Sequence, residues 1–160
     1  MRYSSEVTVS LPRESVLGLL ADRRNDVKWR PGLTLCESIV GEPGSLGSET
    51  RLMYRDADGA VHERMEHVES NRLPDAIEYS LTSPRMVEHQ LHRFVEGQTE
   101  TRWIIESTVT FHRAGLAVRR QSALLEPETV RSMQSFKVFA EGSSAPGRRD
   151  SGLLGASAEG

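Results

Sequence analysis

Cysteine is nearly absent from the 160-residue sequence, in which Cys36 stands alone. A single cysteine excludes an intramolecular disulfide and any cysteine-rich zinc module. The sequence also lacks an apolar run of about 18 residues, and its N-terminus has no apolar signal-peptide core. These absences argue against a membrane span and against secretion, so we expect a soluble, cytoplasmic protein without stable membrane insertion.

Neither sign of charge is in large excess. Twenty Lys and Arg residues against 23 Asp and Glu give a formal net charge of -3, which argues against a dedicated nucleic-acid binder. Lysine is scarce, with only Lys28 and Lys137, but the arginines are scattered, which we interpret as compositional bias rather than a phosphate site. A hydrophobic content of 37% excludes wholesale disorder, and the length fits one domain.

The composition changes at residue 142, where five glycines occur among the last nineteen residues and no apolar periodicity remains. Such a segment cannot bury enough surface to offset the entropy of ordering it. We therefore predict a folded domain over residues 1–141 and a disordered C-terminal tail over residues 142–160. A docking patch formed by Leu153 and Leu154 is the alternative interpretation of the tail.

Hydrophobic periodicity predicts a strand, a pair of short helices, six strands and a final helix. The first strand precedes Pro12, which suits a helix start, and a short second helix is expected over residues 22–28. Pro127, flanked by two glutamates, suits the start of the last helix, whose apolar side carries Met133 and Phe136. Short turns join the middle strands, so we expect an antiparallel meander comprising Thr34–Val40, Glu49–Arg55, Val61–Glu69, Ala76–Thr82, Met86–Glu96 and Thr99–Phe111.

Several local motifs follow one another in a characteristic order: LPRESVLGLL at 11–20, NDVKWRPG at 25–32, GEPGSLGSET at 41–50, GQTETRW at 97–103 and FKVFAE at 136–141. With these motifs, residues 1–141 resemble the START-like, helix-grip superfamily, also called SRPBCC, in its polyketide cyclase/dehydrase-like branch. The resemblance implies an α+β fold with a curved antiparallel β-sheet of about seven strands wrapped around a long C-terminal helix, and two short helices after strand one. It also implies an apolar cavity between sheet and helix.

The last hairpin allows side-chain direction to be argued from spacing. If residues 97 and 98 form a two-residue turn, Glu96 lies opposite Thr99 and His92 lies opposite Trp103. One face then carries a mixed set of apolar and polar residues, which we place inward because the other face is less apolar. A one-residue bulge that turns the polar members to solvent is the alternative. The inward set on these strands comprises Met86, Glu88, Gln90, His92, Phe94, Thr101, Trp103, Ile105, Ser107 and Val109.

The cavity implied by the resemblance then has a predicted lining. Tyr54 and Tyr79 either direct hydroxyl groups toward a ligand or fill ordinary core, and Trp29 either stacks on a ligand or packs beneath the cavity mouth. His92 and Glu88 are the candidates for acid–base catalysis, although about 13 Å of strand separates them. The predicted ligand-binding residues are Trp29, Leu52, Tyr54, Tyr79, Gln90, Phe94, Trp103, Ile105, Ser107, Met133 and Phe136.

The sequence gives little support for other chemistry. His89 and His92, like His62 and His67, are an odd number of residues apart and would point to opposite faces of a strand, so no metal site is expected. Nucleophile elbows and nucleotide-binding glycine loops are missing, and no cofactor is expected. Residues 116–125 form an amphipathic segment that is either a helical lid over the cavity or a membrane-touching surface.

Three functional hypotheses follow. The first is a carrier or sensor that binds a small hydrophobic or aromatic molecule, such as a lipid or a polyketide-like ligand. The second is a polyketide cyclase/dehydrase-like enzyme that shapes and cyclises a reactive chain. The third is a protein-interaction role, such as that of a co-chaperone. The fold implied by the resemblance hosts all three, and the sequence indicates neither the ligand nor an oligomeric state.

Overall fold

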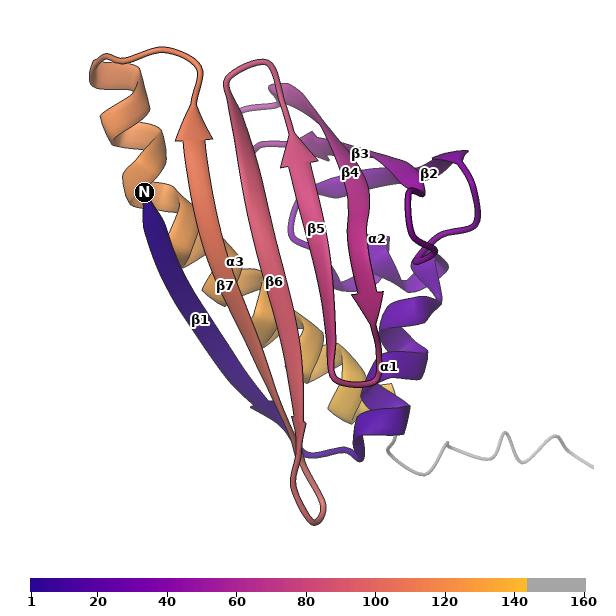
Figure 1. Cartoon of the computed structure of the whole chain (residues 1–160). Helices are drawn as coiled ribbons and strands as arrows, with labels where there is room; N and C mark the ends of the chain where they lie inside the picture. The colour runs from indigo at the N-terminus through magenta and orange to yellow at the C-terminus, as the bar shows by residue number, and fades with distance from the viewer. Residues whose placement is uncertain (144–160) are drawn as a thin grey trace, which may run out of the picture.

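The structure, a computed structural model, describes residues 1–143. Seven antiparallel strands form one sheet in the order β1-β7-β6-β5-β4-β3-β2. The long helix α3 lies across one face of this curved sheet, and the short helices lie near its end by β2 and β3 (Figure 1). The elements are β1 (Arg2–Val9), α1 (Arg13–Ala21), a 3-10 helix η1 (Arg23–Asn25), α2 (Asp26–Trp29), β2 (Leu33–Val40), β3 (Glu49–Arg55), β4 (Val61–Arg72), β5 (Ala76–Thr82), β6 (Met86–Glu96), β7 (Thr101–Phe111) and α3 (Leu116–Ser143).

This arrangement confirms the predicted α+β helix-grip architecture. Each predicted strand is present, and β3, β5 and β6 have the predicted bounds. Strand β4 runs three residues further than expected, to Arg72, because it remains paired with β5 as far as Ala76. None of the helices within residues 1–143 is long and apolar enough to cross a membrane.

The last helix is longer than the sequence indicated. It begins at Leu116, so Pro127 lies inside the helix and not at its start. Pro127 removes one helical hydrogen bond. Leu125 before it and Met133 after it are nevertheless both buried, so packing on both sides of the proline favours one continuous helix. At its other end the helix includes residues 142 and 143 of the predicted tail. Residues 144–160 of that predicted tail lie outside the described residues.

The predicted hairpin register is wrong by two residues. Glu96 lies opposite Thr101, because residues 97–100 form a longer loop closed by a hydrogen bond from the Gly97 N–H to the Glu100 carbonyl. As a result, His92 lies opposite Ile105 and not Trp103. An even shift preserves the face to which each side chain points, and β6 and β7 pair without a bulge. The predicted inward face is therefore correct, and the bulge alternative is wrong.

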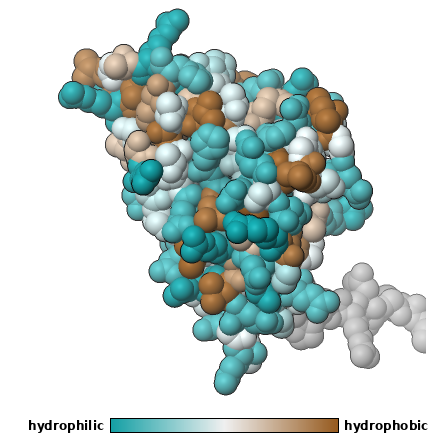
Figure 2. All heavy atoms as spheres, viewed as in Figure 1, coloured by the Kyte–Doolittle hydropathy of each residue, from teal (hydrophilic) through white to brown (hydrophobic). Residues whose placement is uncertain are grey.

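The outer face of the sheet is polar, as expected because side chains alternate between the two faces and the apolar ones point inward. Viewed from that side, the surface is largely hydrophilic with scattered hydrophobic side chains (Figure 2). Arg93 of β6 pairs there with Glu106 of β7 at 3.0 Å, and both side chains are about half exposed. The inner face instead holds the apolar core, so a ligand site is to be sought on that side.

The core of the domain lies between the inner face and the C-terminal half of α3. Phe136 is fully buried, and its ring packs edge-on against Trp29 at 5.2 Å and Trp103 at 5.3 Å between centroids. Phe94 stacks on the other side of Trp103 at 6.1 Å. This aromatic cluster fills one end of the space between sheet and helix and forms the floor of the space that remains.

Candidate functional site

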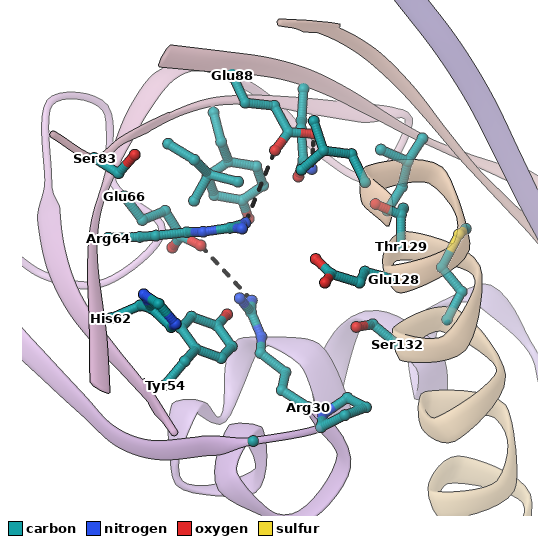
Figure 3. A pocket seen from close by; sticks show the side chains of 18 of the residues that line it. Arg30, Tyr54, His62, Arg64, Glu66, Ser83, Glu88, Glu128, Thr129 and Ser132 are labelled. Atoms are coloured by element: carbon teal, nitrogen blue, oxygen red, sulfur yellow. Dashed lines mark hydrogen bonds and ion pairs between the residues drawn. The ribbon is translucent and has the colours of Figure 1, made fainter. Parts of the chain in front are cut away.

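A cavity of about 1500 Å³ lies between the inner face of the sheet and α3, and it opens to solvent. Its walls come from nearly every element of the fold, and polar side chains from the sheet and from α3 reach into it (Figure 3). Ten of the residues predicted from the sequence line this cavity: Trp29, Tyr54, Tyr79, Glu88, Gln90, His92, Phe94, Trp103, Ile105 and Met133.

Three predicted ligand-binding residues do not line the cavity. Leu52 is fully buried in a separate apolar cluster with Leu33 and Leu81. Phe136 lies behind the tryptophans of the cavity floor, and Ser107 is buried beside Tyr3 of the neighbouring strand β1. All three point inward as predicted, but neighbouring side chains separate them from the open space. Parity gives the face of a side chain, whereas depth depends on the packing around it.

A chain of hydrogen bonds connects the polar residues of the inner face. The Trp103 indole N–H donates to His92 Nδ1 at 3.3 Å, and His92 Nε2 donates to Gln90 Oε1 at 2.9 Å. The amide of Gln90 in turn donates to Glu88 Oε1 at 2.9 Å. The sequence argument correctly separated Glu88 from His92, but Gln90 bridges the two. The single direction of donation along this chain specifies the tautomer of His92, with its proton on Nε2.

Glu88 also connects the sheet to α3. The Tyr3 hydroxyl donates to Glu88 Oε1 at 2.5 Å, and the Thr129 hydroxyl of α3 donates to Tyr3 at 2.9 Å. Burial and the adjacent Glu88 carboxylate raise the pKa of Tyr3 well above its usual value, so the phenol remains a donor. The contact between Tyr3 and Glu88 was not predicted from the sequence, because Glu88 lies on a strand not adjacent to β1.

His92 is held neutral by its surroundings. Burial lowers the pKa of His92 to about 3. Its ring also contacts Tyr79 and Trp103, with centroid separations of 5.0 Å and 5.7 Å. Both ring nitrogens already have hydrogen-bond partners, so proton transfer by His92 would require this chain to open. In the arrangement observed, His92 orients its neighbours and contributes a polar surface to the cavity.

We expect His92 to remain neutral, as the Nε2–H tautomer, between about pH 8 and about pH 5. Nitrogen-15 NMR of the imidazole should show no titration in that range. Because the pKa is lower in the folded protein, the unfolded chain binds the proton first, and the free energy of unfolding should fall as the pH drops from 6.5 toward about 3. Titration of His92 in the folded protein near neutral pH would contradict this assignment.

A group of buried charges in the same wall was not predicted from the sequence. Arg23 Nη1 lies 2.7 Å from Glu66 Oε1, and Arg23 Nε lies 2.9 Å from Asp26 Oδ2. Arg30 lies beside the same two carboxylates at 3.4 and 3.7 Å. Burial would raise the pKa of Glu66, but Arg23 and Arg30 hold it below its usual value, so Glu66 is ionised at neutral pH.

A third arginine, Arg64, projects from β4 into the cavity. Arg64 and Glu66 share the inner face of β4 with Val68, which is buried. Alternation along β4 places both residues on the inner face, just as it does for the polar residues of the last hairpin. Treating the arginines as scattered concealed this pattern, because strand pairing brings together residues that are far apart in the sequence.

Comparison with solved structures identifies the same fold in several proteins. The Zhui aromatase/cyclase from Streptomyces sp. R1128 has a TM-score of 0.79 at 18% identity, covering 91% of this chain and 96% of that chain. A START superfamily protein from Mycobacterium smegmatis has a TM-score of 0.70 at 17% identity, covering 89% and 99%. The di-domain aromatase/cyclase BexL from the BE-7585A biosynthetic pathway has a TM-score of 0.67 at 19% identity, covering 89% of this chain and 49% of that chain.

At these identities the matches show a shared fold and nothing finer. No family model matches the sequence, and no curated protein sequence matches it either.

Proposed function

Because the chain has the START-like helix-grip fold, we propose that it binds a small hydrophobic or aromatic molecule between the sheet and α3, as a carrier or sensor. The observation that supports this function is the cavity itself. Its volume of about 1500 Å³ exceeds the roughly 300–1,000 Å³ of many ligand sites. Its floor is aromatic, and hydrogen bonds position Glu88, Gln90 and His92 in its wall, as in sites that orient an apolar ligand.

The neutral fluorophore N-phenyl-1-naphthylamine tests this function, because its fluorescence rises on transfer from water to an apolar site. We expect saturable binding with one probe per chain, and native mass spectrometry should detect the same complex. Absence of saturable binding to the folded protein would count against a ligand-binding cavity. Near-ultraviolet circular dichroism provides the check that the protein is folded.

A substitution on the inner face should affect this binding, whereas one on the outer face should not. We expect His92→Ala to weaken probe binding by roughly threefold to tenfold, because it breaks the hydrogen-bonded chain and changes the shape of the cavity wall. His89→Ala is the matched control, since His89 neighbours this position on β6 but is exposed on the opposite face. Equal effects of the two substitutions would contradict binding at this wall.

A polyketide cyclase/dehydrase-like activity is the second candidate. Its support is the combination of an aromatic floor with the Arg30 and Arg64 donors above it, together with the fold shared with the Zhui aromatase/cyclase. Such a site would hold a flexible poly-carbonyl chain in one folded shape and bind its oxygen atoms. Co-expression with a minimal polyketide synthase tests this function. A changed ring pattern in the products would support cyclase activity, and an unchanged product profile would oppose it.

A further inference from the structure

The arginines of the cavity wall differ in the hydrogen bonds that they donate to other groups of the protein. Arg23 donates a hydrogen bond of 2.7 Å to Glu66. The guanidinium groups of Arg30 and Arg64 donate no hydrogen bond to any group among residues 1–143, and their carboxylate neighbours lie at 3.4 to 3.9 Å. At these separations opposite charges attract, but little hydrogen-bond energy is gained.

The carboxylates beside these two arginines already have closer partners. Glu66 accepts from Arg23, and Glu88 accepts from Tyr3 and Gln90 at 2.5 and 2.9 Å. The N–H groups of Arg30 and Arg64 therefore remain available to something else. A guanidinium carries five such donors in a rigid plane, and that plane matches the two oxygens of a carboxylate.

Both guanidiniums are placed where a ligand would meet them. Arg30 follows α2 and Arg64 lies on β4, and Figure 3 shows their side chains reaching into the same open space. Their side chains are only 19% and 25% exposed, so water hydrates them incompletely. The aromatic floor around Trp103 lies in the same cavity. One molecule can therefore contact an apolar surface and two cationic groups at the same time.

The inner wall can accept a further negative charge. Arg23, Arg30 and Arg64 face Asp26, Glu66 and Glu88, so the fully ionised wall is neutral. Burial raises the pKa of Asp26, and Asp26 Oδ1 accepts no hydrogen bond. On α3, the exposed Glu128 points its carboxylate into the cavity opposite the two arginines, so an anion is favoured only on the arginine side, and the Ser132 hydroxyl offers a neutral donor (Figure 3).

We propose that the ligand of this cavity is an amphiphilic acid, whose oxyanion lies between Arg30 and Arg64 and whose aromatic or aliphatic body lies on the aromatic floor. This inference rests on the proposed ligand-binding function and names the chemical class of the ligand. The oxyanion is a carboxylate or a group of similar charge and geometry. It replaces the weak contacts of the two arginines with charge-assisted hydrogen bonds.

Two probes with the same aromatic body test the proposal. 8-Anilinonaphthalene-1-sulfonate carries an oxyanion, whereas N-phenyl-1-naphthylamine is the same body without it. We expect the wild-type protein to bind the sulfonate at least about tenfold more tightly than the neutral probe, the effect of one hydrogen bond to a charged group. R30M and R64M should each remove most of this preference while changing the affinity for the neutral probe by less than about threefold.

Three further variants make the result specific. R51M removes an arginine from the outer face of β3, where Arg51 approaches Glu37 and Glu63, and it should leave the preference unchanged. R30K and R64K keep the charge but lose the planar set of donors, and they replace the methionine variants if those fail to fold. They should reduce the preference by a smaller factor.

The outcomes of these measurements test the acidic ligand and the ligand-binding cavity separately. Equal affinity for both probes in the wild type, or a preference for the sulfonate that persists in the Arg30 and Arg64 variants, would overturn the acidic ligand while leaving the cavity as a binding site. A preference that falls equally in R51M would assign the effect to general surface charge and would also overturn it. Failure of both probes to bind the folded protein would overturn the proposed function, and this inference with it.

Discussion

Replacing Phe136 by alanine is expected to lower the free energy of unfolding by about 3–5 kcal/mol. Phe136 is fully buried, and it contacts the rings of Trp29, Trp103 and Phe139 at centroid separations of 5.2 to 6.3 Å. Truncation removes the apolar burial and leaves a void where α3 meets the sheet. Because Trp29 and Trp103 also form the cavity floor, probe binding should weaken as well.

Urea denaturation followed by circular dichroism measures this change. Val138→Ala provides the matched control, because Val138 lies two residues away on α3 and is 74% exposed. We expect the control to change the free energy of unfolding by less than about 0.5 kcal/mol. A loss below about 1 kcal/mol for Phe136→Ala would mean that the helix does not depend on this contact, which would contradict the packing described above.

Local patterns were sufficient to predict the architecture because the sheet is built from short antiparallel connections. Each alternating segment between turn residues became a strand, and strand parity placed Glu88, Gln90 and His92 on the inner face. The hairpin register was missed by two residues, since the sequence does not show whether residues 97–100 form a short or a longer loop. The faces remained correct because the error was even.

The candidate site was predicted less completely, and the omissions have a common physical cause. Arg23 and Asp26 precede β2, whereas Glu66 and Arg64 lie on β4, so their contacts form only when the chain folds. No local spacing indicates such contacts. The apolar and aromatic lining was easier to predict, because hydrophobic residues on an inward face are buried wherever their partners come from. A charged residue is buried only where an opposite charge or hydrogen bonds compensate it, and the sequence does not show which residues provide that compensation.

Replacing Arg23 by methionine should lower the free energy of unfolding by about 3–5 kcal/mol, the usual cost of breaking a buried ion pair by removing one partner. Arg23 is 15% exposed and lies within 3 Å of both Glu66 and Asp26, which are 5% and 1% exposed. The variant leaves the two buried carboxylates with the longer contacts to Arg30 and, for Asp26, a weak contact from the Cys36 thiol at 3.9 Å. Arg24→Met is the control, since the Arg24 side chain is 90% exposed and pairs with Asp22 at the surface. Exposed pairs of this kind contribute about 0–1 kcal/mol.

The pH dependence distinguishes a lost ion pair from lost packing. In the wild type, the lowered pKa of Glu66 stabilises the folded state above the usual value of 4.5, and this stabilisation is lost as the pH falls below it. We expect that without Arg23 burial outweighs Arg30 and raises the pKa of Glu66, so that acidification favours the folded variant instead. The difference in unfolding free energy between wild type and Arg23→Met should therefore be largest near neutral pH and should narrow below about pH 4.5. A difference that stays constant across this range would assign the effect of Arg23 to the packing of its aliphatic stem.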